Sequence, residues 1–353
     1  MGEYITEPTV EMYQVLDKDG NVNEKRTPKL TDTEIKRMYE LMILSRIFDE
    51  VALRLQREGR LLTYASHRGQ EAAQIGVALA MNKEDWMFPA FRENAAFIAR
   101  GYPMEMLYQY WSGDERGMKI PEGMNFFTVA IPVSTQIPHA VGFAWAAKMK
   151  KERYATVVFF GDGATSKGDF HEALNFAGVF KVPIVFICQN NQWAISVPRS
   201  RQSASKTLAQ KAVSYGFPGL QIDGNDVFAI YKEVKEALER CKKGVPTLIE
   251  CFTYRMGDHT TADDASKYRD PKEVEYWKER DPIDRLRKYM EKKGLWNEAY
   301  GKKVLEDAQK KVDDAVKKSE AIQPQSPEEM FKYTYSDIPW NLKEQMEEVM
   351  KGE

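Results

Sequence analysis

Two short motifs with oxygen-bearing side chains each follow an apolar segment of the chain. Gly161-Asp162-Gly163 comes directly after the run 156–160, and Asn190-Asn191 follows the run 184–188. Carboxylate and amide oxygens are ligands that Mg²⁺ accepts at about 2.0–2.1 Å, together with phosphate oxygens and water. Glycines beside the acid let backbone amides approach a phosphate closely. The two motifs together indicate a site for a phosphorylated ligand that is bound through a divalent cation.

Both motifs also have simpler interpretations. Each motif alone is a common turn. A dinucleotide-binding loop requires the spacing G-x-G-x-x-G, which Gly161, Gly163 and Gly168 do not have. An acidic residue between two glycines would also repel a pyrophosphate unless a cation lay between them. The inference therefore depends on the order in which strand, GDG, helix, strand and NN follow one another.

The segments around the motifs alternate between strand and helix patterns. Buried strands are expected at 156–160, 184–188, 219–222 and 247–253, with helices at 169–180 and 227–242. Such alternation predicts βαβ units, and therefore an α/β fold in which a mainly parallel sheet is flanked by helices on both faces. The carboxyl ends of the strands then share one functional edge, where both motifs lie.

The rest of the chain is expected to surround this sheet. Residues 8–30 resemble a peripheral hairpin, with a strand at 10–16 and a turn at 17–21. Thr31 and Glu34 form a capping-box pattern that predicts a helix ending near Gly59. Further helices are expected at 70–80, 94–111, 272–320 and 339–351. The long polar segment 255–271 is expected to be a functional loop. These elements divide the chain into 1–30, 31–320 and a helical C-terminal extension at 321–353.

Composition excludes several classes of protein. A net charge of −2 over 353 residues argues against a nucleic-acid-binding protein. No apolar run reaches the roughly 20 residues that span a membrane, and residues 1–9 lack the character of a targeting peptide. Cys188, Cys241 and Cys251 form no CxxC pair, which favours free thiols in a reducing compartment. A cytoplasmic protein is therefore expected.

The motifs and several other segments resemble a known family. GDG at 161–163, followed by NN at 190–191, resembles the thiamine-diphosphate signature. The segments FPAFRENAAF (88–97), FFTVAIPVSTQIPHAVG (126–142) and YRMGDHTTADDASKYR (254–269) are similar to α subunits of thiamine-diphosphate-dependent 2-oxoacid dehydrogenases, particularly the branched-chain type. The similarity extends through roughly residues 30–340 and implies the thiamine-diphosphate-binding fold.

The resemblance assigns roles to individual residues. It implies that Asp162, Asn191 and the backbone carbonyl of Trp193 bind magnesium, and that His259 is catalytic. The cofactor-binding positions that it implies are Phe91, Arg92, Ile131, Val133, Gly161, Gly163, Ala164, Gln189 and His259. A potassium site is implied at Ala130, Pro132, Thr135 and Gln136.

Other positions depart from the family pattern or keep two interpretations. Phe91 stands where relatives often have tyrosine, and Gln189 stands where branched-chain relatives can have arginine, so two diphosphate contacts differ. Thr260 occupies the place of a serine that is phosphorylated in some relatives. His67 either lines the substrate entrance or is structural.

The resemblance also implies a reaction and partners. The reaction is oxidative decarboxylation of a branched-chain 2-oxoacid, with acyl transfer to the lipoyl group of a dihydrolipoyl acyltransferase, on whose core the enzyme would dock. A β subunit would supply the glutamate that activates the cofactor, in an assembly of two α and two β chains. Three alternatives remain open: a pyruvate or acetoin-type substrate, a nicotinamide-dependent dehydrogenase, and a non-catalytic assembly subunit.

Overall fold

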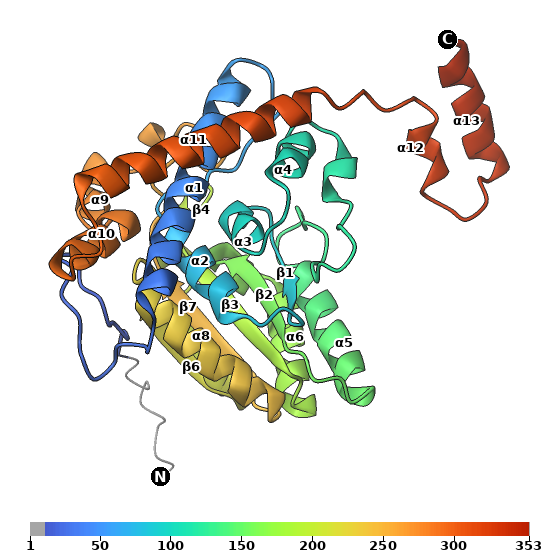
Figure 1. The fold of residues 1–353 in the computed structure, drawn as a ribbon. Helices are drawn as coiled ribbons and strands as arrows, with labels where there is room; N and C mark the ends of the chain where they lie inside the picture. The colour runs from blue at the N-terminus through green and yellow to red at the C-terminus, as the bar shows by residue number, and fades with distance from the viewer. Residues whose placement is uncertain (1–10, 353) are drawn as a thin grey trace.

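A five-stranded parallel sheet forms the centre of the molecule (Figure 1). The computed structural model describes residues 11–352 of the chain. In chain order the strands are β1 (Trp86–Phe88), β2 (Thr156–Gly161), β3 (Ile184–Asn190), β6 (Gly219–Asp223) and β7 (Thr247–Phe252). Their order in the sheet is β1-β2-β3-β7-β6, and every neighbouring pair is parallel. A separate antiparallel hairpin joins β4 (Trp193–Ala194) to β5 (Val197–Pro198). The predicted α/β fold with a parallel sheet is confirmed.

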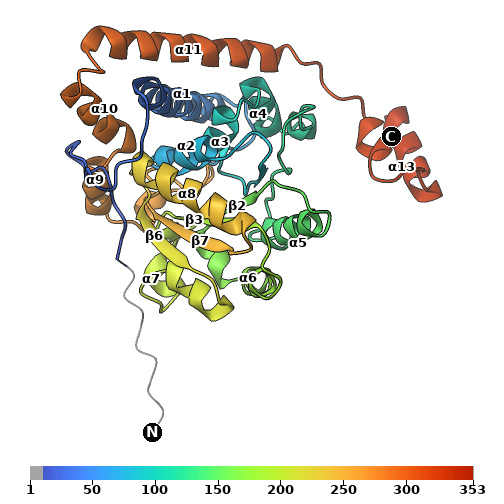
Figure 2. The same cartoon turned by 60° about the horizontal axis from the view of Figure 1, so that its bottom comes forward.

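Helices cover both faces of this sheet (Figure 2). Successive residues of β2 point to opposite sides, so Val157 packs in one apolar core and Val158 in the other. Helices α2 (Glu71–Ala80) and α8 (Val227–Lys242) cover the first face, with α1 (Asp32–Arg57) outside α2. Helices α5 (Gln136–Met149) and α6 (Gly168–Phe180) cover the second. Burial on both faces explains why the central strands β2 and β3 are largely apolar.

The predicted capping box begins α1. Glu34 donates its backbone amide to Thr31 Oγ1 at 3.3 Å, and the Glu34 carboxylate accepts from the backbone amide of Thr31 at 2.8 Å. The helix ends at Arg57, and Gly59 follows with φ +75°. Both ends therefore agree with the prediction.

Two predicted elements differ from the structure, and one strand of the structure was not predicted. The expected helix 94–111 is two helices, α3 (Asn94–Ala99) and α4 (Met104–Trp111). Gly101 adopts φ +85°, which interrupts the helical backbone, and the second helix begins directly after Pro103. The short strand β1 was not predicted. The expected strand 10–16 is wrong within the described residues, where only isolated bridges form at Tyr13 and Leu16. Val10 and residues 1–9 lie outside the described part of the chain.

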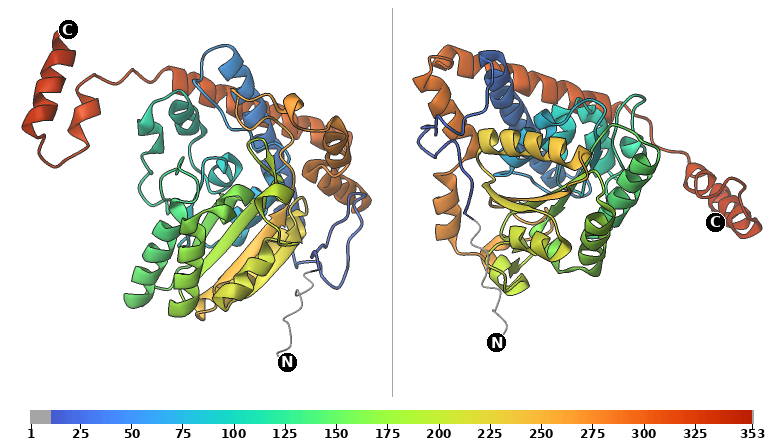
Figure 3. Two further views of the ribbon diagram at one scale, coloured as in Figure 1. Left: turned by 180° about the vertical axis from the view of Figure 1, so that it is seen from behind. Right: turned by 90° about the horizontal axis from the view of Figure 1, so that it is seen from below.

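From residue 271 onward the described chain is mainly helical. Helices α9 (Pro271–Lys278), α10 (Pro282–Lys292) and α11 (Glu298–Glu320) lead to α12 (Glu329–Lys332) and α13 (Trp340–Lys351). The last two project away from the body, and none of their residues is buried (Figure 3). Four shorter helical segments complete the described chain: η1 (Glu115–Met118), η2 (Asp162–Ser166), η3 (Ala209–Tyr215) and η4 (Ala265–Lys267), with α7 at Arg199–Gln202. The division at residues 30 and 320 stays a prediction.

The sequence predicted that the chain has no membrane-spanning helix and that its cysteines are free thiols. Within 11–352, no helix combines the length and the apolar character needed to cross a membrane. The three cysteines are free and buried. The cytoplasmic location stays a prediction.

Candidate functional site

The two strand tips that carry the motifs lie side by side. In the register of β2 and β3, Gly161 pairs with Gln189, so Asp162 and Asn191 both follow at the carboxyl edge of the sheet. Both side chains are buried, with relative exposures of 1% and 6%. They line one cavity of about 590 Å³, a size typical of small-molecule sites. The juxtaposition predicted from the motif order is therefore present.

Most of the predicted site residues line this cavity. The lining includes Phe91, Arg92, Ala130, Ile131, Val133, Gln136, Gly161, Asp162, Gly163, Ala164, Gln189, Asn191, Trp193 and His259. Pro132 and Thr135 do not line it; they line a second cavity of about 580 Å³ that shares Ala130 and Gln136 with the first. All four expected potassium positions therefore line the second cavity, and Ala130 and Gln136 also line the first.

Asp162 is the carboxylate of the predicted cation site. Burial raises its pKa to about 6, and a hydrogen bond from Gln202 opposes that shift. Gln202 of α7 donates Nε2 to Asp162 Oδ2 at 2.7 Å, a contact that the sequence did not predict. The carboxylate is therefore ionised at neutral pH. The backbone amide of Asn191 also lowers this pKa.

Asn191 and Trp193 occupy the turn after β3. The Asn191 amide donates from Nδ2 to Gln70 Oε1 at 3.2 Å, and its Oδ1 accepts from the Trp193 backbone amide at 3.3 Å. The Trp193 carbonyl, the third expected metal ligand, accepts from Arg255 Nη1 at 3.3 Å. Within residues 11–352, no group of three or more His, Cys, Asp or Glu side chains is placed to hold a metal ion. The expected ligand set has only one such side chain.

Arg92 brings a buried positive charge to the same cavity. Its Nη1 donates to the Ser66 carbonyl, and its Nη2 donates to the His259 carbonyl at 2.9 Å. Burial, and next the charge of Arg255, lower its pKa to about 10, so the guanidinium remains charged at neutral pH. A fixed guanidinium can bind an anionic oxygen through charge-assisted hydrogen bonds.

His259 lies against Arg92 and Arg255. Arg92 Nη2 approaches His259 Nδ1 at 3.2 Å, and Arg255 Nη1 approaches the same atom at 3.4 Å. Burial, and then the two arginine charges, lower the pKa of His259 to about 4, so its imidazole is neutral at neutral pH. Because arginine can only donate, Nδ1 is the acceptor and the proton of the neutral ring sits on Nε2. Phe91 contacts this ring edge-on, with centroids 6.0 Å apart.

The loop 255–271 is held in place by its own side chains. The His259 backbone amide donates to Asp263 Oδ2 at 2.8 Å, and Arg255 Nη2 donates to the Tyr268 hydroxyl at 2.8 Å. Thr260 also lines the cavity. The loop therefore positions His259 at the site. This agrees with the functional loop that was predicted from the polar character of the segment.

Gln189 is held in a buried polar network. Its Nε2 donates to Glu93 Oε1, and its Oε1 accepts from Gln74 Nε2 at 3.1 Å. Burial raises the pKa of Glu93 to about 7. Neither Glu93 nor Gln74 was predicted from the sequence. Gln74 is an amide within an otherwise apolar helix, whereas Glu93 stands between Arg92 and Asn94 and carries no distinguishing local signal.

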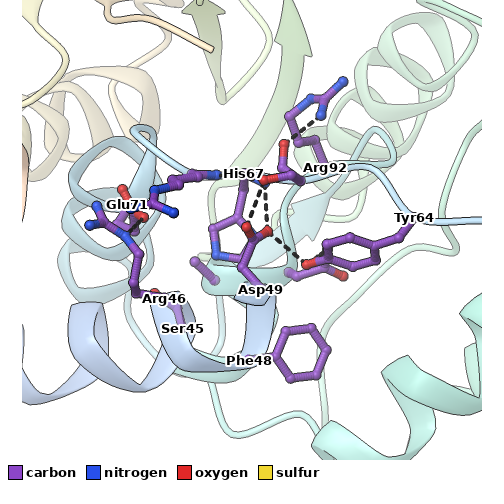
Figure 4. A network of polar contacts seen from close by, with 12 residues as sticks. Ser45, Arg46, Phe48, Asp49, Tyr64, His67, Glu71 and Arg92 are labelled. Carbon is purple, nitrogen blue, oxygen red and sulfur yellow. Dashed lines mark hydrogen bonds and ion pairs between the residues drawn. The ribbon is translucent and has the colours of Figure 1, made fainter. Parts of the chain in front are cut away.

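A second buried network supports Arg92 from below (Figure 4). The Asp49 carboxylate of α1 accepts from the Tyr64 hydroxyl at 2.9 Å, from Ser66 Oγ at 2.6 Å and from the His67 backbone amide at 2.8 Å. These bonds fix the segment whose Ser66 carbonyl holds Arg92. His67 is fully buried beside Asp49 and does not line the cavity, which favours its structural interpretation.

The cavity wall suits a ligand with an anionic end and an apolar end. A Cβ added at Gly161 would meet no atom within 4 Å, so the backbone there is open. Ile131 and Val133 are 54% and 48% exposed and provide an apolar wall. The buried Gln136 Oε1 has no hydrogen-bond partner among the described residues, and an unpaired carbonyl oxygen is a suitable cation ligand. Together with Asp162 and Arg92, these features fit a diphosphate held with a divalent cation.

Comparisons with known proteins identify relatives along nearly the whole chain. Residues 39–328 match the family model described as "Dehydrogenase E1 component". The chain is 46% identical over 339 residues to pyruvate dehydrogenase E1 component subunit alpha of Acholeplasma laidlawii, which covers 95% of this chain and 98% of that protein. It is 41% identical over 345 residues to the protein of the same name from Staphylococcus aureus, with 97% and 93% covered. The Staphylococcus epidermidis protein of that name is also 41% identical.

Proposed function

The chain belongs to the dehydrogenase E1 component family, and from this premise we propose that it is the α subunit of a thiamine-diphosphate-dependent pyruvate dehydrogenase. The observation that carries the proposal is the meeting of Asp162, Asn191, Arg92 and His259 in one cavity at the carboxyl edge of the sheet. The relatives bear the pyruvate name, so the pyruvate alternative has support that the expected branched-chain substrate lacks.

In this proposal the chain holds the phosphorylated end of the cofactor. Asp162 and Asn191 would bind magnesium. The Trp193 carbonyl would be the third ligand once its hydrogen bond from Arg255 is broken. Arg92 and the backbone around Gly161, Gly163 and Ala164 would bind the diphosphate. Thiamine diphosphate, when bound, accepts the electron pair that remains as carbon dioxide leaves a 2-oxoacid. Ile131 and Val133 would orient its pyrimidine end, and Gln136 with Ala130, Pro132 and Thr135 would hold potassium.

His259 would act through its Nε2 proton. The neutral ring directs Nδ1 toward Arg92 and Arg255, so Nε2–H is the group available for a ligand. We propose that it donates a hydrogen bond to an oxygen of the bound ligand and assists transfer of the acyl group to the lipoyl arm. Phe91 would make an apolar contact with the cofactor, and Gln189 would make a contact through its amide.

A second chain would complete the site. The exposed side chains of Ile131, Val133 and Ile195 form an apolar rim that suits coverage by another subunit. We propose that a β subunit covers it and provides the carboxylate that the cofactor needs, in a tetramer of two α and two β chains. That tetramer would dock on the core of a dihydrolipoyl acyltransferase and receive its lipoyl domain.

The test is an assay of each chain alone and of both mixed. Oxidative decarboxylation of pyruvate and of 2-oxoisovalerate, and oxidative cleavage of acetoin, would be followed with an artificial electron acceptor. The proposal expects turnover only in the mixture, with pyruvate preferred. Full activity of this chain alone would refute the shared site, and a preference for 2-oxoisovalerate would restore the branched-chain expectation.

The same preparation tests the two remaining alternatives. Stabilisation against heat by NAD, without stabilisation by thiamine diphosphate and magnesium, would favour a nicotinamide-dependent dehydrogenase. Failure of the mixed chains to bind thiamine diphosphate would favour a non-catalytic assembly subunit.

A further inference from the structure

Two glutamines stand one turn apart at the start of α2. Gln70 caps the helix and Gln74 follows, and both are fully buried. Residues four apart lie on the same face of a helix, so both face the tips of the sheet strands. An amide that is removed from water costs free energy unless its donor and acceptor find partners, so their contacts matter.

Both the nitrogen and the oxygen of the Gln74 amide are hydrogen-bonded within the protein. Its Nε2 donates to the Arg92 carbonyl and to Gln189 Oε1, both at 3.1 Å, and its Oε1 accepts from the Ala95 backbone amide at 3.1 Å. These contacts tie the Arg92 segment to the tip of β3. Gln74 therefore has the bonding that a purely structural amide is expected to have.

Gln70 is bonded differently. Its Oε1 accepts from Asn191 Nδ2 at 3.2 Å, whereas its Nε2 is buried with no partner among the described residues. An unpaired buried donor lowers stability, and such groups in native proteins call for an explanation. The one side-chain bond that Gln70 does make goes to the amide of a proposed metal ligand.

That bond and the bond from the Trp193 backbone amide together fix the orientation of the Asn191 amide. With Nδ2 committed to Gln70, the carbonyl oxygen Oδ1 lies at the other end, where it meets the Trp193 backbone amide at 3.3 Å. A cation can bind the oxygen but not the nitrogen of an amide. Without an acceptor at position 70, the Asn191 amide would lose one of the two contacts that keep its nitrogen away from the cation.

We propose that Gln70 is a positioning residue, which holds the Asn191 side chain with its oxygen available to the divalent cation. This inference rests on the proposed function, because it takes Asn191 as a metal ligand. The Gln70 amide is oriented so that its oxygen accepts from Asn191. In this orientation its Nε2 has no partner within the described chain, and the unpaired donor lowers the stability of the fold. Gln70 lines the same cavity as Asp162 and Asn191, and in this proposal it acts on the cation through Asn191.

The experiment measures thiamine diphosphate binding to the assembled α and β chains over a series of Mg²⁺ concentrations, by isothermal titration calorimetry. Gln70→Met removes the acceptor, so the half-saturating Mg²⁺ concentration should rise about two- to twelve-fold, the equivalent of one net hydrogen bond. The same change removes the unpaired donor, so the melting temperature of the cofactor-free protein should shift by less than about 3 °C.

Two further variants separate positioning from folding. Gln70→Glu keeps an acceptor for Asn191 Nδ2, so it should retain the wild-type Mg²⁺ requirement although its buried carboxylate lowers the melting temperature. Gln74→Met is the matched control, one turn away. It should lower the melting temperature and weaken cofactor binding, because its paired amide supports Arg92, but leave half-saturating Mg²⁺ at saturating cofactor unchanged.

The outcomes distinguish this inference from the proposed function. A wild-type Mg²⁺ requirement in Gln70→Met, or an equal rise in Gln70→Glu and Gln70→Met, would overturn the role of Gln70 alone. Absence of Mg²⁺-dependent cofactor binding in the wild-type assembly would instead overturn the proposed function.

Discussion

Replacement of Gly161 by alanine adds one methyl group to the floor of the cavity. Gly161 is the last residue of β2 and adopts φ −85° and ψ 170°, a conformation open to any residue. A Cβ there would meet no atom within 4 Å. The variant should therefore fold with a free energy of unfolding within about 0.5 kcal/mol of the wild-type value, or slightly above it.

Cofactor binding should respond much more strongly. If the diphosphate lies against the Gly161 backbone, the added methyl occupies space that the ligand needs. Overpacking by a methyl group costs about 1–3 kcal/mol in well-packed sites. This corresponds to a dissociation constant for thiamine diphosphate that is about 5- to 150-fold higher. Calorimetric titration of the assembled α and β chains at saturating Mg²⁺, beside thermal unfolding, measures both quantities.

Two other glycines provide controls for this prediction. A Cβ at Gly142 also meets nothing within 4 Å, but Gly142 lies inside α5 and does not line the cavity. Gly142→Ala should therefore leave the affinity unchanged and raise the free energy of unfolding by about 0.5–1 kcal/mol. A Cβ at Gly163 would lie 2.8 Å from Ala194 Cβ, so Gly163→Ala should lower the melting temperature as well as the affinity. Wild-type affinity in Gly161→Ala would refute the placement of the diphosphate beside this strand tip.

Three other predictions concern Arg92, His259 and Thr31. Arg92→Lys keeps the charge but loses the planar fork, so the dissociation constant of thiamine diphosphate should rise about 10-fold or more in the same titration; equal affinity would contradict a direct phosphate contact. The pKa of His259 is lowered to about 4 in the folded chain, so the unfolded chain binds more protons between about pH 6.5 and 4, and stability falls as the pH falls through that window. Urea denaturation should show a shallower decline in His259→Gln, and an identical decline would remove this explanation. Thr31→Ala removes the cap of α1 and should lower the free energy of unfolding by about 1 kcal/mol without changing Mg²⁺ dependence, whereas unchanged stability would show that the cap is dispensable.

Local patterns predicted most of the sheet and the two motifs at its edge. The apolar runs that became β2 and β3 are buried on both faces, which leaves a continuous apolar signal in the sequence. The capping box of Thr31 and Glu34 also depends only on neighbours three residues apart. In the same way, Gly101 and Pro103 carried a local signal for the break between α3 and α4 that the helical periodicity obscured.

The supporting residues could not be predicted in this way. Gln70 meets Asn191, and Gln74 meets Gln189, across more than a hundred residues of chain. The amide of a glutamine has no local preference that reveals such a partner. The strand β1 was missed for a related reason, since its three residues gain their strand conformation only by pairing with β2. The order of strands in the sheet likewise depends on crossovers that periodicity does not encode.

The central claim is that Asp162 and Asn191 jointly hold the cation that anchors the diphosphate. The most direct measurement is the affinity of the assembled chains for thiamine diphosphate, with and without Mg²⁺, for the wild type and for Asp162→Ala. The account predicts that Mg²⁺ strengthens binding in the wild type and has no effect in Asp162→Ala, with a similar loss in Asn191→Ala. An affinity and a Mg²⁺ dependence in Asp162→Ala equal to those of the wild type would contradict it.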